Sequence, residues 1–378
     1  MKVERCVWNQ DSGWQEPIDP LKNRQSASLV LAFAAPALLK DPAPLAHIQS
    51  RFPQALICGC STAGEISGLR VMDDSFTASA IAFDSTTVTC VDAAIDVASQ
   101  SFAVGKSLAE QLPRSGLVHT LVFSDGLRVN GAQLAAGIAS GLPPGVAVTG
   151  GLSGDGDRFK ETLVISKGQA KTGQVVLVGL YGANLRVGFG SMGGWDSFGP
   201  ERRITKARDN VLYELDGCSA LDLYKEYLGE HAAKLPASGL LFPLTVRRER
   251  SEETLVRTIL AVDESAHSLT FAGDVPEGAF ARLMRANFDR LVDGATGAAQ
   301  KSRHKLGLKT QFALLVSCVG RKLVLGPRIE EEVETVADVL GTDCTGGFYS
   351  YGEISPAAPN ASCQLHNQTM TITTLSEV

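Results

Sequence analysis

The chain has 378 residues, of which 44% are hydrophobic and 20% are charged, and its formal net charge is −6. A chain of this size and composition can bury a large core, which excludes intrinsic disorder and leaves room for two domains. The 41 acidic residues outnumber the 35 basic ones, and the basic residues form no stripe along the sequence, so nucleic acids and anionic membranes are poor partners.

The beginning of the chain, Met1-Lys2-Val3-Glu4-Arg5, contains no apolar signal segment. The longest apolar run, residues 29–39, is shorter than a membrane span, so we expect a cytoplasmic protein. The eight cysteines are too few and too scattered for a disulfide framework. Cys58 and Cys60 form a C-x-C pair without a second pair at metal-binding spacing, which argues against structural zinc.

Short runs of Val, Ile and Phe alternate with Gly and Ser turns in the first half of the chain, a pattern typical of strands. Helices are predicted at residues 102–112 and 133–140. Strands are predicted at residues 28–34, 55–59, 78–83, 88–94, 117–123, 147–149, 161–166, 174–181 and 185–189.

The second half begins with a predicted helix at residues 219–231, whose leucines and Tyr224 form an apolar face. Strands are predicted at 240–246, 255–262, 312–319 and 322–325. A helix at 329–340 has an acidic first turn that suits the helix dipole, and Gly341 is its expected C-cap. The fold class that follows is α+β, with two sheet-rich lobes, flanking helices and related halves.

Four loops concentrate glycine and small polar residues at strand ends: 59–68, 124–126, 150–157 and 345–356. Glycine lets a backbone approach a ligand closely, although it also simply makes tight turns. Four such loops together favour a pocket.

Three of these loops resemble the signatures of the FIST family, named for F-box and intracellular signal transduction. They are G-C-S-T-A-G-E from Gly59, G-G-x-S-G-D-G from Gly150 and G-F-Y-S-Y-G-E-I-S-P from Gly347. The resemblance runs from about residue 28 to 356. It implies a FIST N-terminal-like domain at 28–215, a FIST C-terminal-like domain at 216–360 and, at 361–378, a C-terminal strand packing on the core. A composition break at 202–218 favours this boundary.

The resemblance implies an intracellular small-ligand sensor in signal transduction, of a kind that often stands alone in bacteria. The glycine loops would then line the pocket, with these ligand-binding residues: Ser61, Thr62, Glu65, Gly151, Ser153, Asp155, Gly346, Tyr349, Tyr351 and Glu353.

The chain also resembles a stand-alone bacterial branch that binds haem, responds to nitric oxide and acts on histidine kinases. This implies haem b as cofactor and a separate histidine kinase or cyclic-di-GMP enzyme as partner. A haem sensor needs a neutral imidazole or a thiolate on the iron. His366, in an alternating apolar and polar run, is the candidate ligand, and a plain hydrogen bond to a carbonyl is its alternative role. Cys344 and Cys363 are alternative thiolates.

The remaining histidines are weaker haem candidates. His119 lies in a predicted strand and is expected in the core, whereas His231, His267 and His304 have polar surroundings typical of the surface.

The sequence Gly-Glu-Ile-Ser occurs twice, at residues 64–67 and 352–355. We expect Glu65 and Glu353 to face a shared cleft between related halves; the alternative is that each carboxylate binds only its neighbouring backbone.

Two other functions remain open. One is an amino-acid-binding FIST sensor without haem. The other is a hydrolase or acyl-transfer enzyme that uses Ser61 or Cys60, because residues 59–63 nearly match G-x-S-x-G but lack the last glycine. The G-x-G-x-x-G at 188–193 is followed by no predicted helix, which argues against a dinucleotide site.

Overall fold

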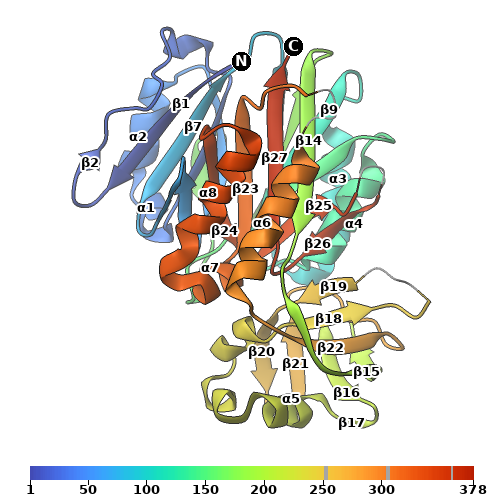
Figure 1. Ribbon diagram of the computed structural model, residues 1–378. Helices are drawn as coiled ribbons and strands as arrows, with labels where there is room; N and C mark the ends of the chain where they lie inside the picture. The colour runs from blue at the N-terminus through green and yellow to red at the C-terminus, as the bar shows by residue number, and fades with distance from the viewer. Residues whose placement is uncertain (251–253, 304–306, 359–360) are drawn as a thin grey trace.

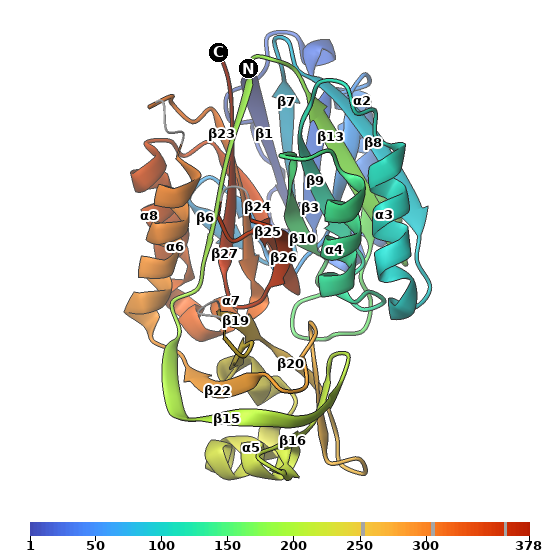
Figure 2. The same ribbon diagram turned by 90° about the vertical axis from the view of Figure 1, so that its right-hand side faces the viewer.

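The computed structural model describes residues 1–250, 254–303, 307–358 and 361–378. A larger body of three sheets with outer helices lies above a smaller unit built around a fourth sheet, as Figures 1 and 2 show. This arrangement confirms the α+β fold class with two sheet-rich lobes.

The three sheets of the body are mixed, and each draws strands from distant parts of the chain. The first has the order β12(Gln169–Lys171), β11(Val164–Ser166), β4(Leu56–Ser61), β3(Leu29–Ala34), β7(Phe76–Ala82), β1(Lys2–Asn9), β2(Gly13–Trp14). The second has the order β26(Cys363–His366), β25(Gly352–Pro356), β10(Ala147–Leu152), β9(Leu117–Ser124), β13(Gln174–Tyr181), β8(Thr87–Ala94). The third has the order β14(Leu185–Met192), β27(Met370–Glu377), β23(Phe312–Cys318), β24(Thr345–Ser350), β5(Glu65–Ser67), β6(Arg70–Met72).

The body repeats one unit three times. Each sheet has one parallel pair, β3/β4, β9/β10 or β23/β24, joined through a helical connection, as parallel strands require. An antiparallel strand, β7, β13 or β27, flanks the first member of each pair. After each parallel pair, a hairpin crosses to the next sheet: β5–β6 joins β24, β11–β12 joins β4, and β25–β26 joins β10. The relationship expected between two halves therefore extends to three units.

Helices cover the outside of the sheets, with α6 and α8 on one side and α3 and α4 on the other (Figure 2). The α-helices are α1(Pro36–Lys40), α2(Pro42–Arg51), α3(Ser101–Gln111), α4(Gly131–Gly141), α5(Ala220–Leu228), α6(Phe288–Ser302), α7(Val319–Leu325) and α8(Ile329–Leu340). Short 3-10 turns are η1(Arg24–Ser26), η2(Ala98–Gln100), η3(Gly229–Lys234), η4(Ala237–Leu241) and η5(Gly326–Arg328). None of the described helices is long and apolar enough to cross a membrane.

One aromatic cluster fills the centre where the three sheets meet. The ring of Phe33 lies 4.8 Å from that of Phe348 and 5.7 Å from that of Phe123, and each of these residues comes from a different sheet. All three side chains are buried. Offset and edge-on aromatic contacts of this kind contribute beyond the apolar area they bury, so this cluster ties the three sheets together.

The smaller unit is built on an antiparallel sheet with α5 against it, and it is inserted between β14 and α6. Its strands are β19(Thr254–Arg257), β18(Leu244–Arg247), β22(Phe280–Arg285), β15(Asp196–Arg208), β16(Val211–Leu215), β21(Ser268–Phe271), β20(Ile259–Asp263) and β17(Cys218–Ser219). Residue 215, the predicted end of the first domain, is the last residue of β16. Strand β27, in the segment predicted to pack on the core, pairs with both β14 and β23.

Of two elements predicted near the C-terminal end of the chain, one is confirmed and the other is wrong. The helix at 329–340 and its cap are confirmed, since α8 has these bounds and Gly341 adopts φ +66°. The strand predicted at 322–325 is wrong, because these residues belong to helix α7. In α7 the buried Arg321 reaches Glu332 of α8, and this long-range contact outweighs the apolar strand-like run.

The helices α1, α2 and α6 were not predicted. The buried face of α6 is made largely of alanine and glycine, which gives a weak apolar pattern. Those small residues let the helix pack close to the chain beside it: a Cβ added at Gly294 would lie 1.5 Å from the carbonyl oxygen of Gly193.

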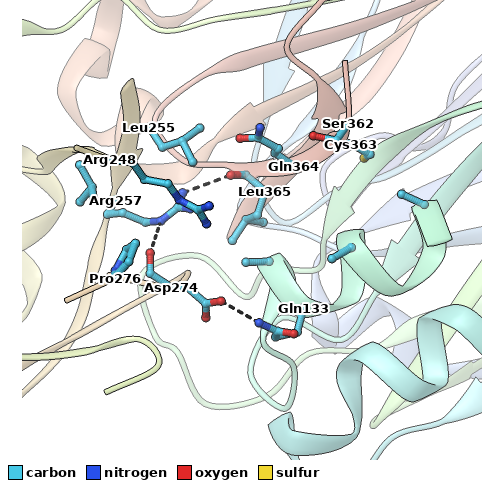
Figure 3. A pocket seen from close by; sticks show the side chains of 14 residues that line it. Gln133, Arg248, Leu255, Arg257, Asp274, Pro276, Ser362, Cys363, Gln364 and Leu365 are labelled. Atoms are coloured by element: carbon cyan, nitrogen blue, oxygen red, sulfur yellow. Dashed lines mark hydrogen bonds between the residues drawn. The ribbon is translucent and has the colours of Figure 1, made fainter. Parts of the chain in front are cut away.

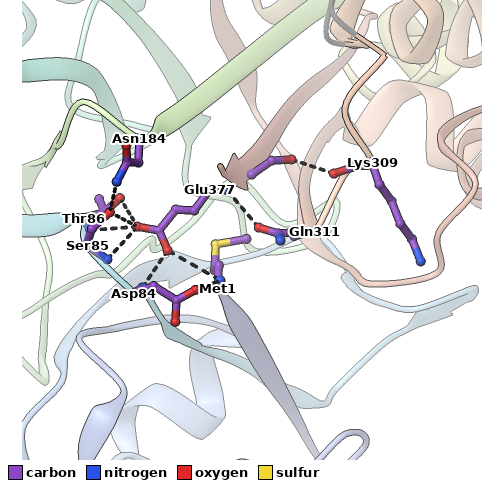
Figure 4. A network of polar contacts seen from close by, with 9 residues as sticks. Met1, Asp84, Ser85, Thr86, Asn184, Lys309, Gln311 and Glu377 are labelled. Carbon is purple, nitrogen blue, oxygen red and sulfur yellow. Dashed lines mark hydrogen bonds and ion pairs between the residues drawn. The ribbon is translucent and has the colours of Figure 1, made fainter.

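At the end of the last strand, the carboxylate of Glu377 organises a turn far away in the sequence (Figure 4). It accepts hydrogen bonds from the backbone N–H groups of Asp84 (2.6 Å), Ser85 (3.0 Å) and Thr86 (2.8 Å). Burial alone raises the pKa of Glu377, but these bonds and the Thr86 hydroxyl outweigh it and lower the pKa to about 2. The interaction therefore persists at neutral pH and fastens β27 to the turn between β7 and β8.

Candidate functional site

The glycine loops lie at equivalent places in the three units, next to the parallel pairs. A Cβ atom added at Gly59, Gly150 or Gly347 would lie 1.8–2.0 Å from a carbonyl oxygen of the parallel neighbouring strand. Real Cβ atoms do not approach an oxygen so closely. The packing of each strand pair thus requires glycine at these positions, whether or not a ligand is present.

Glu65 lies in the first unit and is buried. Its carboxylate accepts hydrogen bonds from the Thr62 hydroxyl and from both the backbone N–H (3.1 Å) and the hydroxyl (2.6 Å) of Ser75. These contacts give both carboxylate oxygens a partner within the same unit.

Glu353 occupies the equivalent place in the third unit. It accepts hydrogen bonds from the Ser350 hydroxyl (2.6 Å) and from the hydroxyl (2.9 Å) and backbone N–H (3.2 Å) of Thr369. The two glutamates therefore share one pattern of contacts, and each binds its own neighbours as the alternative interpretation proposed. Neither residue lines any of the five most prominent cavities among the described residues.

These two carboxyl groups predict a pH dependence of stability. Burial raises the pKa of Glu65 from 4.5 to about 7 and that of Glu353 to about 8. The folded state therefore keeps protons that the unfolded chain has released above pH 4.5, and stability falls as the pH rises through 7 to 8. We expect urea unfolding midpoints to be higher at pH 5.5 than at pH 8.5. Glu65→Gln and Glu353→Gln should each flatten this slope; an unchanged slope in both variants would contradict the assignment.

Ser61, Ser153 and Asp155 connect neighbouring loops. The Ser61 hydroxyl donates to the carbonyl oxygen of Gly154 (2.8 Å), and the Ser153 hydroxyl donates to that of Ser124 (2.9 Å). The carboxylate of Asp155 accepts a hydrogen bond from the Tyr351 hydroxyl. These residues link the first, second and third units to one another.

Gly151, Gly346 and Tyr349 also have structural partners. Gly151 pairs with Glu353 across β10 and β25, and Gly346 pairs with Ser67 across β24 and β5. The Tyr349 hydroxyl donates to the buried carboxylate of Glu332 (2.8 Å). The ligand-binding role of the ten predicted residues stays a prediction, and none of them lines the five cavities.

The surroundings of Ser61 and Cys60 do not resemble those of an activated nucleophile. The Ser61 hydroxyl also accepts from the backbone N–H of Leu163 (2.9 Å), so main-chain groups occupy it on both sides. Burial raises the pKa of the Cys60 thiol well above its usual value, which disfavours the reactive thiolate. After Ser61 the chain continues into β5, whereas a nucleophile elbow needs a helix.

His366 ends β26 and is 8% exposed. Its Nε2 lies 2.9 Å from the carbonyl oxygen of Ser355, so Nε2–H donates and Nδ1 remains an acceptor. Burial lowers the pKa of His366 to about 4, which keeps the ring neutral. The cavity that His366 lines has a volume of about 290 Å³. This volume lies just below the range of about 300–1,000 Å³ usual for small-molecule sites, so the cavity in this arrangement leaves little room for a group as large as a porphyrin.

The other candidate iron ligands are no better placed than His366 to bind haem. His119 is buried in β9 and bonds the Thr149 hydroxyl (2.8 Å), as expected for a core residue. His231 and His267 are exposed, as predicted, and His304 lies outside the described residues. Burial raises the pKa of the Cys344 thiol to about 11 and that of Cys363 further. In the described part of the chain, no three His, Cys, Asp or Glu side chains gather as a metal-binding group.

A cleft of about 560 Å³ lies between the body and the smaller unit (Figure 3). Helix α4 and strand β26 form its body side, while β18, β19 and the segment after β21 form the other side. Its polar lining includes Gln133, Arg248, Arg257, Asp274 and Gln364. The volume lies in the range usual for small-molecule sites.

Arg257 is the most informative residue of this cleft. Its side chain is 4% exposed, and the guanidinium donates to the carbonyl oxygens of Asp274 (3.1 Å) and Leu365 (3.1 Å). Among the described residues, no carboxylate lies within ion-pair distance of it. Burial lowers the pKa of Arg257 to about 10, although the nearby Asp274 charge opposes this. A buried cation whose hydrogen bonds, in the described part of the chain, go to carbonyl oxygens is well placed to attract an anion.

Asp274 spans the cleft from the smaller unit to the body. Its carboxylate accepts from the side-chain amide of Asn130 (2.7 Å), the N-cap of α4. It also accepts from the side-chain amide of Gln133 (2.8 Å) in the first turn of that helix (Figure 3). These amides are neutral, so the negative charge of Asp274 stays available to a cation. The cleft thus presents arginine and carboxylate groups within one cavity.

Sequence reasoning did not find the residues of the cleft. Arg257 and Asp274 lie in ordinary strand and turn patterns, and Gln133 lies on a small-residue helix. Only the insertion of the smaller unit after β14 brings these segments together. The one feature of the sequence that could have indicated the cleft is Arg257, an arginine within a largely apolar strand pattern.

Comparison with known proteins agrees with the family that the glycine motifs indicate. The FIST N domain matches residues 28–218, and the FIST C domain matches residues 220–356. The chain is also 24% identical over 235 residues to the uncharacterized protein MJ1623 of Methanocaldococcus jannaschii, a match that covers 55% of this chain and 45% of that relative. The chain therefore spans less than half of the relative's length. FIST domains are associated with sensing in signal transduction. With both domain models matched in order across most of its length, the chain belongs to the FIST family.

Proposed function

We propose that this protein is a small-ligand sensor of signal transduction whose ligand binds in the cleft between the body and the smaller unit. The observation that carries the proposal is the buried guanidinium of Arg257, which lacks an ion-paired carboxylate among the described residues and lines a cavity of about 560 Å³. A ligand carboxylate would neutralise this charge in surroundings where charge-assisted hydrogen bonds are strong.

The ligand class that fits is a small zwitterion, such as an amino acid. Its carboxylate would bind Arg248 and Arg257, and its ammonium group would bind Asp274; all three residues lie on the smaller unit's side of the cleft. This is the amino-acid-sensing alternative of the sequence analysis, placed in a cleft instead of among the glycine loops.

A ligand in this cleft would act on the angle between the two lobes. The polar contacts between them include Arg257 to Leu365, Gln133 to Asp274 and Gln368 to the carbonyl oxygen of Leu240 (3.0 Å). Polar interfaces of this kind permit relative domain motion, and a ligand held by these residues of the smaller unit that also contacts α4 or β26 on the body side favours the closed arrangement. A separate signalling protein, such as a histidine kinase or a cyclic-di-GMP enzyme, would recognise that arrangement.

The test is amino-acid binding by isothermal titration calorimetry, using the twenty common amino acids. We expect Arg248→Ala to weaken binding by about tenfold or more, because one charge-assisted hydrogen bond contributes about 1.5–3 kcal/mol. Arg248 is exposed, so the substitution should leave the fold intact. Arg208→Ala, an 86% exposed side chain in the same unit, is the matched control and should bind normally. Equal affinities in the two variants would contradict the proposal.

Haem and nitric oxide sensing remains a separate prediction from the family resemblance. Its test is a Soret band on haem reconstitution that weakens or shifts in His366→Ala and is unchanged in His231→Ala.

A further inference from the structure

A second cavity, of about 290 Å³, lies where the two lobes are joined. It is lined by Gly193, Gly194 and Trp195, which connect β14 to β15, and by residues of β19 and of the segment that follows β26. We call it the Asn367 cavity. Leu255 of β19 lines both this cavity and the cleft, so the two spaces lie close to one strand.

The side chain of Asn367 is the unusual feature of this cavity. It is 0% exposed, and neither its Nδ2 nor its Oδ1 has a hydrogen-bond partner in the part of the chain that the structure describes. A buried amide without partners is destabilising, and nearly all buried polar groups in native proteins are paired. Such an amide is retained at a cost to stability, which is typical of groups kept for a ligand.

The other polar groups around Asn367 define what can bind there. His366 is neutral, and its Nδ1 is available as an acceptor because Nε2–H bonds Ser355. Lys301 provides a positive charge, and no Asp or Glu is among the described residues that line the cavity. The site therefore offers one amide edge with a donor next to an acceptor, in a space with positive or neutral potential.

We propose that the Asn367 cavity is a second binding site, separate from the cleft, for a small planar molecule with a donor–acceptor edge: a carboxamide or a nucleobase. The ligand carbonyl oxygen accepts from Asn367 Nδ2–H, and the ligand N–H donates to Asn367 Oδ1. Asparagine recognises the edge of adenine in this bidentate manner. Because the connecting residues Gly193–Trp195 form one wall, a ligand here contacts the segment that joins the lobes.

Trp195 provides the readout, since its ring lines the cavity and its Nε1–H bonds the carbonyl oxygen of Gln368 (3.0 Å). The chain has three tryptophans, so Trp8→Phe/Trp14→Phe leaves Trp195 as the single fluorophore. In this background, titration with benzamide or with uracil should change the tryptophan emission. A response to benzamide alone indicates a carboxamide ligand, and a response to uracil alone indicates a nucleobase. Benzoate, which has the same shape as benzamide but no N–H donor, should bind about tenfold more weakly.

Asn367→Leu tests the residue itself. We expect it to weaken benzamide or uracil binding by about 10- to 100-fold and to raise the thermal midpoint of the ligand-free protein by about 2–4 °C, because it removes two unpaired polar atoms at similar volume. Asn184→Leu, at an exposed site, should change neither quantity.

Three results would overturn the proposal: no response to either probe, a lower midpoint in Asn367→Leu with unchanged binding, or haem uptake in this cavity that depends on His366. The Arg248→Ala variant distinguishes this site from the cleft. It should weaken amino-acid binding and leave the benzamide and uracil titrations unchanged.

Discussion

Replacing Glu332 with leucine is expected to lower the free energy of unfolding by about 3–5 kcal/mol, as measured by urea denaturation. Glu332 and Arg321 form an ion pair of 2.7 Å, and both side chains are fully buried. Glu332 also accepts from Ser317 (3.0 Å) and from Tyr349 (2.8 Å). Removal of its carboxylate leaves the Arg321 charge buried without a counter-ion, which is the main source of the loss.

Two further variants identify the cause. Glu331→Leu lies on the same helix but at an exposed ion pair with Arg328, and it should change stability by no more than about 0.5 kcal/mol. The double variant Arg321→Met/Glu332→Leu should recover much of the loss, since it removes both charges. If the double variant is less stable than Glu332→Leu alone, the unpaired-charge explanation is wrong.

Substituting Gly59 with alanine is expected to cost about 4 kcal/mol or more, or to prevent folding. Gly59 has φ +151°, and an added Cβ would lie 1.8 Å from the carbonyl oxygen of Ala32 in the adjacent central strand. Relief of that clash would separate β3 from β4 at the centre of the first unit. The measurement is the yield of folded protein together with its urea midpoint.

Gly116→Ala is the matched control for backbone strain. Gly116 also has a positive φ, +73°, but an added Cβ would meet nothing within 4 Å. Its substitution should cost only about 1–2 kcal/mol, the price of the left-handed conformation for a residue with a side chain. Equal losses in the two variants would show that φ and not close packing explains the requirement at Gly59.

Local pattern was sufficient for many elements of this fold. The helix at 329–340 has an acidic start, an apolar face and a terminal glycine, and these act within the segment itself. The strands β9 and β13 are rich in Val and Leu and were also predicted. Where burial depended on small residues, as in α6, or on a distant ion pair, as in α7, the local pattern was weak or misleading.

The glycine motifs identified the family, but none of the ligand-binding residues predicted from them lines the cavities described above. Glu65 and Glu353 looked like ligand groups because they follow glycine loops, whereas the structure gives each of them hydroxyl and N–H partners in its own unit. Conversely, Arg257 and Asn367 have no local motif. Among the described residues, Arg257 lacks an ion-paired carboxylate and the Asn367 amide lacks hydrogen-bond partners, and such absences are visible only when the neighbours are placed.

The sequence by itself determined the α+β class, most of the elements of the body and, through three glycine motifs, membership of the FIST family. Those properties depend on hydrophobic period, turn chemistry and close backbone approach, all of which are encoded within short segments. The tertiary structure alone decided that the body is a threefold repeat and that the smaller unit is inserted after β14. It also decided that cavities form where the lobes meet, because a cavity depends on side chains from α4, β19 and β26, which only long-range packing brings together.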